Sequence, residues 1–140
     1  MTTTLWLRIS SIVSLLFAAG HTLGGFQEWS PVGDNPVLRS MKDVHFDTMG
    51  VNRSYFDFYM GFGWSISVIL LMQAILLWQL ASLARTQAAA VRPMILVIAI
   101  ASAVSCMIAW RYIFLLPTLF FLALTASLVV AWVVARSPIK

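Results

Sequence analysis

The chain has 140 residues, of which 61% are hydrophobic and only 10% are charged. A soluble domain of this size could not bury so much apolar surface, so the composition excludes an ordinary soluble protein. The net charge of +4 does not indicate nucleic-acid binding, because the basic residues are scattered at the ends of apolar runs. The single cysteine excludes an intramolecular disulfide and a cysteine metal cage.

Four apolar runs along the chain are each long enough to cross a bilayer, which takes about 20 helical residues. The first, at about residues 5–26, has the order of a signal peptide, but we expect it to be retained as a helix. The others extend over about residues 55–83, 93–110 and 112–134. We therefore predict an all-α polytopic membrane protein, a single-domain bundle of four transmembrane helices.

The ends of these runs carry residues that are typical of helix boundaries. Pro93 suits the first turn of the third helix, where its missing N–H has no intrahelical acceptor to lose. Arg136 and Pro138 close the fourth helix. The very short connection between the third and fourth helices predicts that they form an antiparallel hairpin.

A long loop over about residues 27–54 connects the first two helices and is predicted to be partly helical. The segment from Pro31 to Pro36 has turn composition, and Asn35 is expected to cap a helix that begins at Pro36. Apolar residues then recur at helical spacing, at Val37, Leu38, Met41 and Val44. This pattern predicts a short amphipathic helix, which either lies at the membrane surface or covers the bundle.

Basic residues set the expected orientation, because cytoplasmic loops carry an excess of lysine and arginine. One side receives Arg8, Arg85, Arg92, Arg136 and Lys140, and the other receives Arg39, Lys42, Arg53 and Arg111. We therefore expect both termini to be cytoplasmic. All the acidic residues and both histidines lie between residues 21 and 57, so the polar chemistry is expected on the outer face.

Pairs of small residues four apart predict the internal faces of the bundle, because helices in lipid associate where their backbones approach closely. The pairs are Gly20 and Gly24, Gly61 and Ser65, and Ala101 and Ser105. Such pairs serve contacts within one chain or between chains, so the oligomeric state stays open.

His21 and Glu28 are the first candidates for catalytic residues. His21 lies inside the first span, where ionisable residues are rare and often functional. Glu28 follows seven residues later, on the same face if the helix extends that far, and the two could transfer a proton. The alternatives for His21 are a neutral imidazole bonded to a neighbouring helix, or a metal ligand.

Asp57 is the third candidate catalytic residue. Residues 54–57, SYFD, match a capping box, in which Asp57 would start the second helix. The alternative is an acid–base role among the aromatic side chains at the membrane boundary.

Aromatic residues and one arginine are the candidate ligand-binding residues: Tyr55, Tyr59, Trp64, Trp110 and Arg111. Arg111 is expected to reach the layer of Glu28 and Asp57, where a guanidinium could pair with a carboxylate. Its alternative role is that of a snorkelling residue in an aromatic belt. The sequence lacks HExxH and ExxH spacings, so we predict no metal site and no cofactor.

The motif GHTLG at residues 20–24, Met49-Gly50 and above all SYFDFYMGFG at residues 54–63 resemble a family of small bacterial four-helix membrane proteins without an established activity. The resemblance covers most of the chain and implies this architecture in the bacterial inner membrane. It emphasises His21, Tyr55, Asp57 and Tyr59 without supplying a reaction. The layout is also similar to the EXPERA group of sterol isomerases and sterol-binding proteins, whose sequence motifs are not recognisable here.

Three functions fit these residues. The first is binding or isomerisation of a small hydrophobic ligand of lipid, isoprenoid or sterol-like chemistry, with His21 and either Glu28 or Asp57 moving a proton. The second is an accessory or assembly subunit of a larger membrane complex. The third, a small transporter or metal-handling protein, is disfavoured because the last two helices contain no acid and no histidine.

The expected partners are the lipid bilayer, a hydrophobic small molecule, and a second copy or a membrane complex, with no nucleic acid. The sequence leaves open whether the protein is an enzyme.

Overall fold

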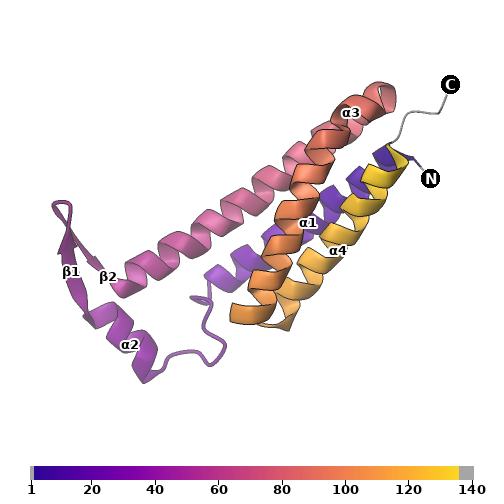
Figure 1. Ribbon diagram of the computed structural model, residues 1–140. Coiled ribbons are helices and arrows are strands. Elements are labelled where there is room, and N and C mark those ends of the chain that lie inside the picture. Colours follow the sequence, from indigo (N-terminus) through magenta and orange to yellow (C-terminus); the bar gives the residue numbers. More distant parts are fainter. Residues whose placement is uncertain (1, 136–140) are drawn as a thin grey trace. The chain divides into compact units, whose positions relative to one another are not determined.

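The structure, a computed structural model, describes residues 2–135. Its elements in chain order are α1 (Thr3–Gly25), α2 (Pro36–Asp43), β1 (His45–Thr48), β2 (Val51–Ser54), α3 (Tyr55–Tyr112) and α4 (Leu115–Val134) (Figure 1). Three of these helices, α1, α3 and α4, are long and apolar enough to cross a membrane. The predicted closing residues Arg136 and Pro138, and the basic Lys140, lie outside the described residues.

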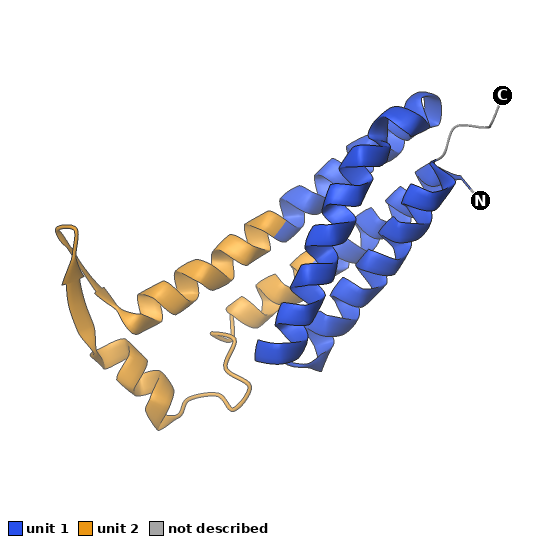
Figure 2. Cartoon of the chain, viewed as in Figure 1, with its two compact units in different colours: residues 1–17, 70–140 blue, residues 18–69 orange. Residues whose placement is uncertain are grey.

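The chain divides into two compact units, which are described separately (Figure 2). Unit 1 contains residues 1–17 and 70–140, and unit 2 contains residues 18–69.

Helix α3 has 58 residues, which is about 87 Å at 1.5 Å per residue and roughly three times the hydrocarbon thickness of a bilayer. It is interrupted at Gln87, whose φ of −132° and ψ of 47° are not helical. The connection predicted over residues 84–92 is therefore a single-residue kink, and Pro93 lies inside the helix. The reason is composition, since residues 84–92 are mainly alanine, arginine and glutamine, which favour helix.

One apolar core joins four helical segments of unit 1. Leu77, Ala81 and Ala84, before the kink, belong to the same cluster as Val91, Ile95 and Ala99 after it. Within unit 1 the segments on either side of the kink therefore pack against each other as a hairpin, and Figure 1 shows α3 turning back on itself. The remaining buried members of the cluster come from α1 and from α4 with the residue after it: Leu7, Leu124, Leu128, Ala131 and Ala135.

Buried serines of α1 add polar contacts inside unit 1. The Ser10 and Ser127 hydroxyls lie 2.8 Å apart, which joins α1 to α4. Ser11 donates to the Ala74 carbonyl over 2.7 Å, and Ser14 donates to the Leu70 carbonyl over 3.0 Å. These serines were not singled out from the sequence, although a hydroxyl inside a membrane span is typical of a helix contact.

The small-residue rule locates the internal face of the second half of α3 only approximately. Ala101 is exposed, whereas Ala99, Ser102 and Ala109 are buried. The buried residues recur at the helical period from Val91, and Ala101 lies next to this stripe but outside it. The prediction that Ala101 lies on the internal face is therefore wrong.

The loop of unit 2 confirms the predicted helix cap. The Asn35 side chain accepts hydrogen bonds from the Val37 and Leu38 N–H groups over 3.0 and 3.1 Å, and Pro36 is the first residue of α2. Leu38 is buried and Val37 is exposed. Asn35 therefore starts α2 by satisfying two N–H groups that a helix leaves free.

A β-hairpin follows α2 and departs from the all-α prediction. Strands β1 and β2 pair antiparallel, with His45 opposite Ser54 and Thr48 opposite Val51. The two turn residues, Met49 and Gly50, have φ values of +48° and +80°. Two consecutive positive values are typical of the two-residue turns that match strand twist.

Candidate functional site

The indole of Trp29 lies against three glycines of unit 2. A Cβ atom built on Gly24 would lie 3.0 Å from the indole, and one on Gly25 would lie 2.7 Å from it. A Cβ on Gly63 would collide with the same ring. We call Gly24, Gly25 and Gly63 the glycine cradle. The cradle exists because these positions lack side chains, so the ring occupies space that any other residue would fill.

The backbone after α1 directs Trp29 into the glycine cradle. Glu28 and Trp29 have φ values of +55° and +45°, which non-glycine residues seldom adopt. The N–H groups of Gln27 and Trp29 both donate to the Gly24 carbonyl, over 3.0 and 2.9 Å. These bonds close the C-terminal end of α1 and turn the chain back at Trp29.

Three residues predicted from the sequence converge on Trp29. The indole Nε1 donates to the His21 carbonyl over 2.9 Å, and the Tyr59 hydroxyl donates to the Trp29 carbonyl over 3.0 Å. The His21 and Trp64 ring centroids lie 5.1 and 5.2 Å from that of Trp29. Trp29 itself was missed, and its signal was a tryptophan just beyond a pair of adjacent glycines.

The His21 ring is half-buried and has a polar partner on α3. Its Nδ1 lies 3.0 Å from the Ser67 hydroxyl, which is itself buried. This contact matches the alternative in which the imidazole bonds to a neighbouring helix. It also orients the ring, which a proton-transferring histidine needs as well.

Glu28 forms its hydrogen bonds with Lys42 and not with His21. Because α1 ends at Gly25, the helix does not extend to Glu28 and the predicted shared face is not formed. Both Glu28 carboxylate oxygens accept from Lys42 Nζ, over 2.8 and 2.9 Å, and Lys42 lies 4.7 Å from the centre of the Phe56 ring. Within residues 18–69 no hydrogen bond or ion pair joins Glu28 to His21 or to Asp57. The Glu28–Lys42 ion pair instead attaches α2 to the segment that follows α1.

Asp57 forms the predicted capping box. Its Oδ2 accepts from the Ser54 N–H over 2.8 Å, and its own N–H donates to the Ser54 hydroxyl over 3.1 Å. The two bonds satisfy N–H groups at the start of α3. The carboxylate is exposed beside Arg53, Gly61 and Ser65, in an outward groove of about 320 Å³ that is completed by Phe58 and Phe62.

The other predicted ligand-binding residues are Tyr55 in unit 2 and Trp110 and Arg111 in unit 1. Tyr55 is exposed, and its ring lies 5.1 Å from that of Phe46. Trp110 and Arg111 are exposed and belong to unit 1, where the Arg111 guanidinium lies 5.3 Å from the centre of the Tyr112 ring. Among the described residues, no group of three histidine, cysteine or acidic side chains could hold a metal ion.

Trp110 lines a different cavity, which we call the lateral pocket. It has a volume of about 380 Å³ and is lined by Ala103, Cys106, Met107, Trp110, Thr118, Leu122 and Thr125. Cys106 Sγ donates to the Thr118 carbonyl over 3.6 Å, and the Thr118 hydroxyl donates to the Phe114 carbonyl over 3.1 Å. The Thr125 hydroxyl oxygen is buried and has no hydrogen-bond partner among residues 2–135. The other polar side chains of the lateral pocket, Cys106 and Thr118, thus have partners, and the Thr125 hydroxyl does not.

No protein-family model, curated protein or solved structure matches the chain.

Proposed function

We propose that the protein crosses the bilayer four times and binds a small hydrophobic ligand in the lateral pocket. The observation that carries this proposal is the Thr125 hydroxyl, which lines a mainly apolar pocket and is buried without a partner among residues 2–135. Buried hydroxyl groups are almost always hydrogen-bonded, because an unmade bond has a free-energy cost. A ligand that carries one polar group would supply the bond.

Four crossings are supported by the lengths of the helical segments. The kink at Gln87 divides α3 into segments of residues 55–86 and 88–112, and each is longer than the roughly 20 residues that a crossing needs. Helices α1 and α4 supply the other two crossings. The packing of the two halves of α3 in one core supports a hairpin over a single long crossing.

The lining of the lateral pocket restricts the class of ligand. Its volume of about 380 Å³ lies near the lower end of the range for small-molecule sites, which is roughly 300–1,000 Å³. Trp110, Met107 and Leu122 suit an apolar body. A hydroxyl can donate or accept, so the polar group is an alcohol, a ketone, a quinone or an ester. An isoprenoid, sterol-like or quinone-like molecule has this chemistry.

Binding rather than isomerisation is proposed for the lateral pocket. Its lining contains no carboxylate and no imidazole that could move a proton. His21, Glu28 and Asp57 belong to unit 2, where each has its own partner. Acid–base chemistry by these three residues stays a prediction.

The first experiment is native mass spectrometry with lipid extraction, on protein purified in a mild detergent. We expect one hydrophobic molecule per chain. Thr125→Val removes the hydroxyl at constant shape and is expected to weaken binding up to about tenfold, the value of one neutral hydrogen bond. Ala103→Leu fills the pocket and is expected to abolish binding.

Thr86→Val is the matched control, because Thr86 is exposed and lies outside the lateral pocket. The ligand should survive this change. Wild-type protein without any bound hydrophobic molecule, or a ligand that persists equally in Thr125→Val and Ala103→Leu, contradicts the proposal.

An accessory subunit is the second candidate, and the outward groove on α3 favours it. Gly61 is exposed, and a Cβ built there would meet no atom within 4 Å. Ser65 lies one turn further and is also exposed. In lipid such a small-residue face allows close approach of another helix. Gly61→Leu should then release a co-purified membrane partner or second copy, whereas Val68→Leu, at an exposed site outside the groove, should not.

A further inference from the structure

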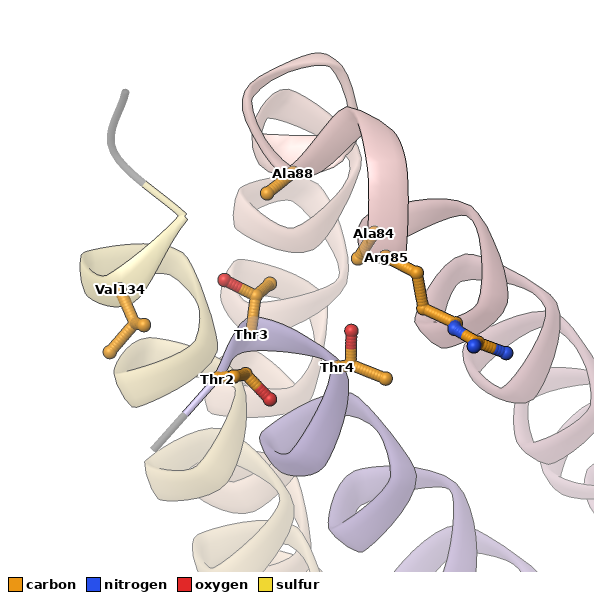
Figure 3. A pocket seen from close by; sticks show the side chains of 7 residues that line it. All are labelled: Thr2, Thr3, Thr4, Ala84, Arg85, Ala88 and Val134. Atoms are coloured by element: carbon orange, nitrogen blue, oxygen red, sulfur yellow. The ribbon is translucent and has the colours of Figure 1, made fainter. Parts of the chain in front are cut away.

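A second cavity of unit 1 opens beside the first turn of α1 (Figure 3). It has a volume of about 590 Å³ and is lined by Thr2, Thr3, Thr4, Ala84, Arg85, Ala88 and Val134. We call it the terminal pocket. None of its residues touches the lateral pocket, so an inference about it is independent of the ligand proposed above.

Thr3 is a buried residue with a polar side chain. It is 5% exposed, and no hydrogen bond within residues 2–135 engages its hydroxyl. The reason is its position, since a threonine inside a helix can donate to the preceding turn but Thr3 is the first residue of α1. Figure 3 shows the Thr3 and Thr4 side chains pointing toward the turn that carries Ala84 and Ala88. The hydroxyl is therefore available to bond a ligand that enters the terminal pocket.

The start of α1 adds backbone donors to this hydroxyl. The Thr2 carbonyl accepts from the N–H groups of Leu5 and Trp6, over 3.1 and 3.4 Å. The N–H groups of Thr3 and Thr4 precede these intrahelical bonds, as the first N–H groups of any helix do. Together with the helix dipole they favour a negatively charged ligand.

The charge of unit 1 also favours an anion. All five acidic residues of the chain lie between residues 28 and 57, so unit 1 contains none. Arg8 and Arg92 lie over the rings of Trp78 and Trp132, at 4.8 and 4.2 Å.

Arg85 is the basic residue of the terminal pocket itself. It is exposed and forms no ion pair among residues 2–135. Figure 3 shows its guanidinium directed away from the threonines. The long, exposed side chain can turn toward an anion held by the first turn of α1.

We infer that the terminal pocket binds a phosphate group, that of an anionic phospholipid. Hydroxyl groups, the amides of a helix start and an arginine are the donors that phosphate oxygens accept from. The phospholipid is the expected source because three lining residues, Thr4, Ala84 and Val134, are each followed or preceded in the sequence by an exposed apolar residue, namely Leu5, Leu83 and Val133. Acyl chains would lie against these side chains, while the headgroup would occupy the terminal pocket.

The test is native mass spectrometry of the full chain in a neutral detergent, with three probes added in turn: phosphatidylglycerol, diacylglycerol and inorganic phosphate. We expect a phosphatidylglycerol adduct and no diacylglycerol adduct. Arg85→Gln and Thr3→Val should each weaken phosphatidylglycerol binding about tenfold, as expected for one charge-assisted or phosphate hydrogen bond. Arg85 is exposed, so Arg85→Gln is expected to fold even if Thr3→Val does not.

Arg111→Gln is the matched control, since it removes the same charge from unit 1 outside the terminal pocket. It should leave the adduct unchanged. The proposed site is wrong if Arg111→Gln and Arg85→Gln weaken phosphatidylglycerol binding equally. It is also wrong if Arg85→Gln does not weaken that binding. The melting temperature is measured with the same probes. If inorganic phosphate raises it as much as phosphatidylglycerol does, and Arg85→Gln removes both effects, the ligand is free phosphate and not a phospholipid.

Discussion

The Tyr59 hydroxyl donates a hydrogen bond to the Trp29 carbonyl over 3.0 Å, and the rings of the two residues meet edge to face at 6.2 Å. Through this pair α3 holds the turn that follows α1, at the residue whose indole fills the glycine cradle. The Trp29 ring thus packs against three glycines of unit 2. A substitution that adds one carbon atom to a glycine tests this packing.

Gly63→Ala is expected to destabilise the protein by about 1 to 3 kcal/mol, the usual cost of inserting a carbon into a well-packed site. The added Cβ would collide with the Trp29 ring, which is a rigid part of its side chain. The measurement is the melting temperature in detergent, followed by tryptophan fluorescence. The fluorescence spectrum of the folded variant should also change, since the indole has to move.

Gly61→Ala is the matched control on the same helix. A Cβ at Gly61 meets no atom within 4 Å. Alanine in an open helical site stabilises by roughly 0.5 to 1 kcal/mol relative to glycine. The two substitutions are thus expected to have opposite signs. Equal effects on the melting temperature would show that helix propensity, and not the glycine cradle, decides the outcome.

Local signals in the sequence predicted much of this fold. The apolar runs located α1, α3 and α4. Asn35 before Pro36 predicted the start of α2, and the SYFD segment predicted the capping box of Asp57. In the two helix caps the residues that make the contact are within four positions of one another, so their spacing alone specifies the geometry.

Contacts between distant residues could not be predicted in the same way. Trp29 meets Gly63 and Tyr59 only because the chain reverses after Gly25, through positive φ values at Glu28 and Trp29 that the residue types do not favour. The same reversal removes Glu28 from the face of His21. The sequence located the connection between residues 84 and 92 but not its form, a single-residue kink at Gln87, because most of these residues favour helix.

The Ser10–Ser127 pair is expected to stabilise unit 1 modestly. Its two hydroxyls are 2.8 Å apart and both residues are buried. In a double-mutant cycle of Ser10→Ala and Ser127→Ala, the coupling should be about 0.6 kcal/mol and at most about 1.7 kcal/mol, the range for side-chain hydrogen bonds between membrane helices. The measurement is reversible unfolding in mixed micelles. Ser82→Ala is the control, because Ser82 is exposed and donates only within its own helix.

Ser54→Ala is expected to weaken the start of α3 by about 1 kcal/mol, because the Asp57 N–H loses its acceptor. Ser54→Thr keeps a hydroxyl in the capping position and should retain most of the stability. Thermal unfolding followed by circular dichroism measures both variants. If both lose the same stability, the burial of Ser54 matters more than its cap.

The four proposed crossings predict which positions share a side of the membrane. The test uses single cysteines in a Cys106→Ala background, at Met49, Gln87 and Ile113. These exposed residues lie in the hairpin turn, at the α3 kink and just before α4, respectively. A maleimide that cannot cross membranes is then added to intact cells. Met49→Cys and Ile113→Cys should react at once, whereas Gln87→Cys should react only after permeabilisation, because the basic residues near it favour the cytoplasm.

The combination of three positions separates the alternatives. If α3 crossed only once, Met49→Cys and Ile113→Cys would lie on opposite sides, which contradicts the hairpin. The reverse pattern, with only Gln87→Cys reactive in intact cells, keeps four crossings and inverts the orientation. Simultaneous reaction of all three in intact cells would show that α3 does not cross the bilayer, since its 58 residues lie between the Met49 and Ile113 labels.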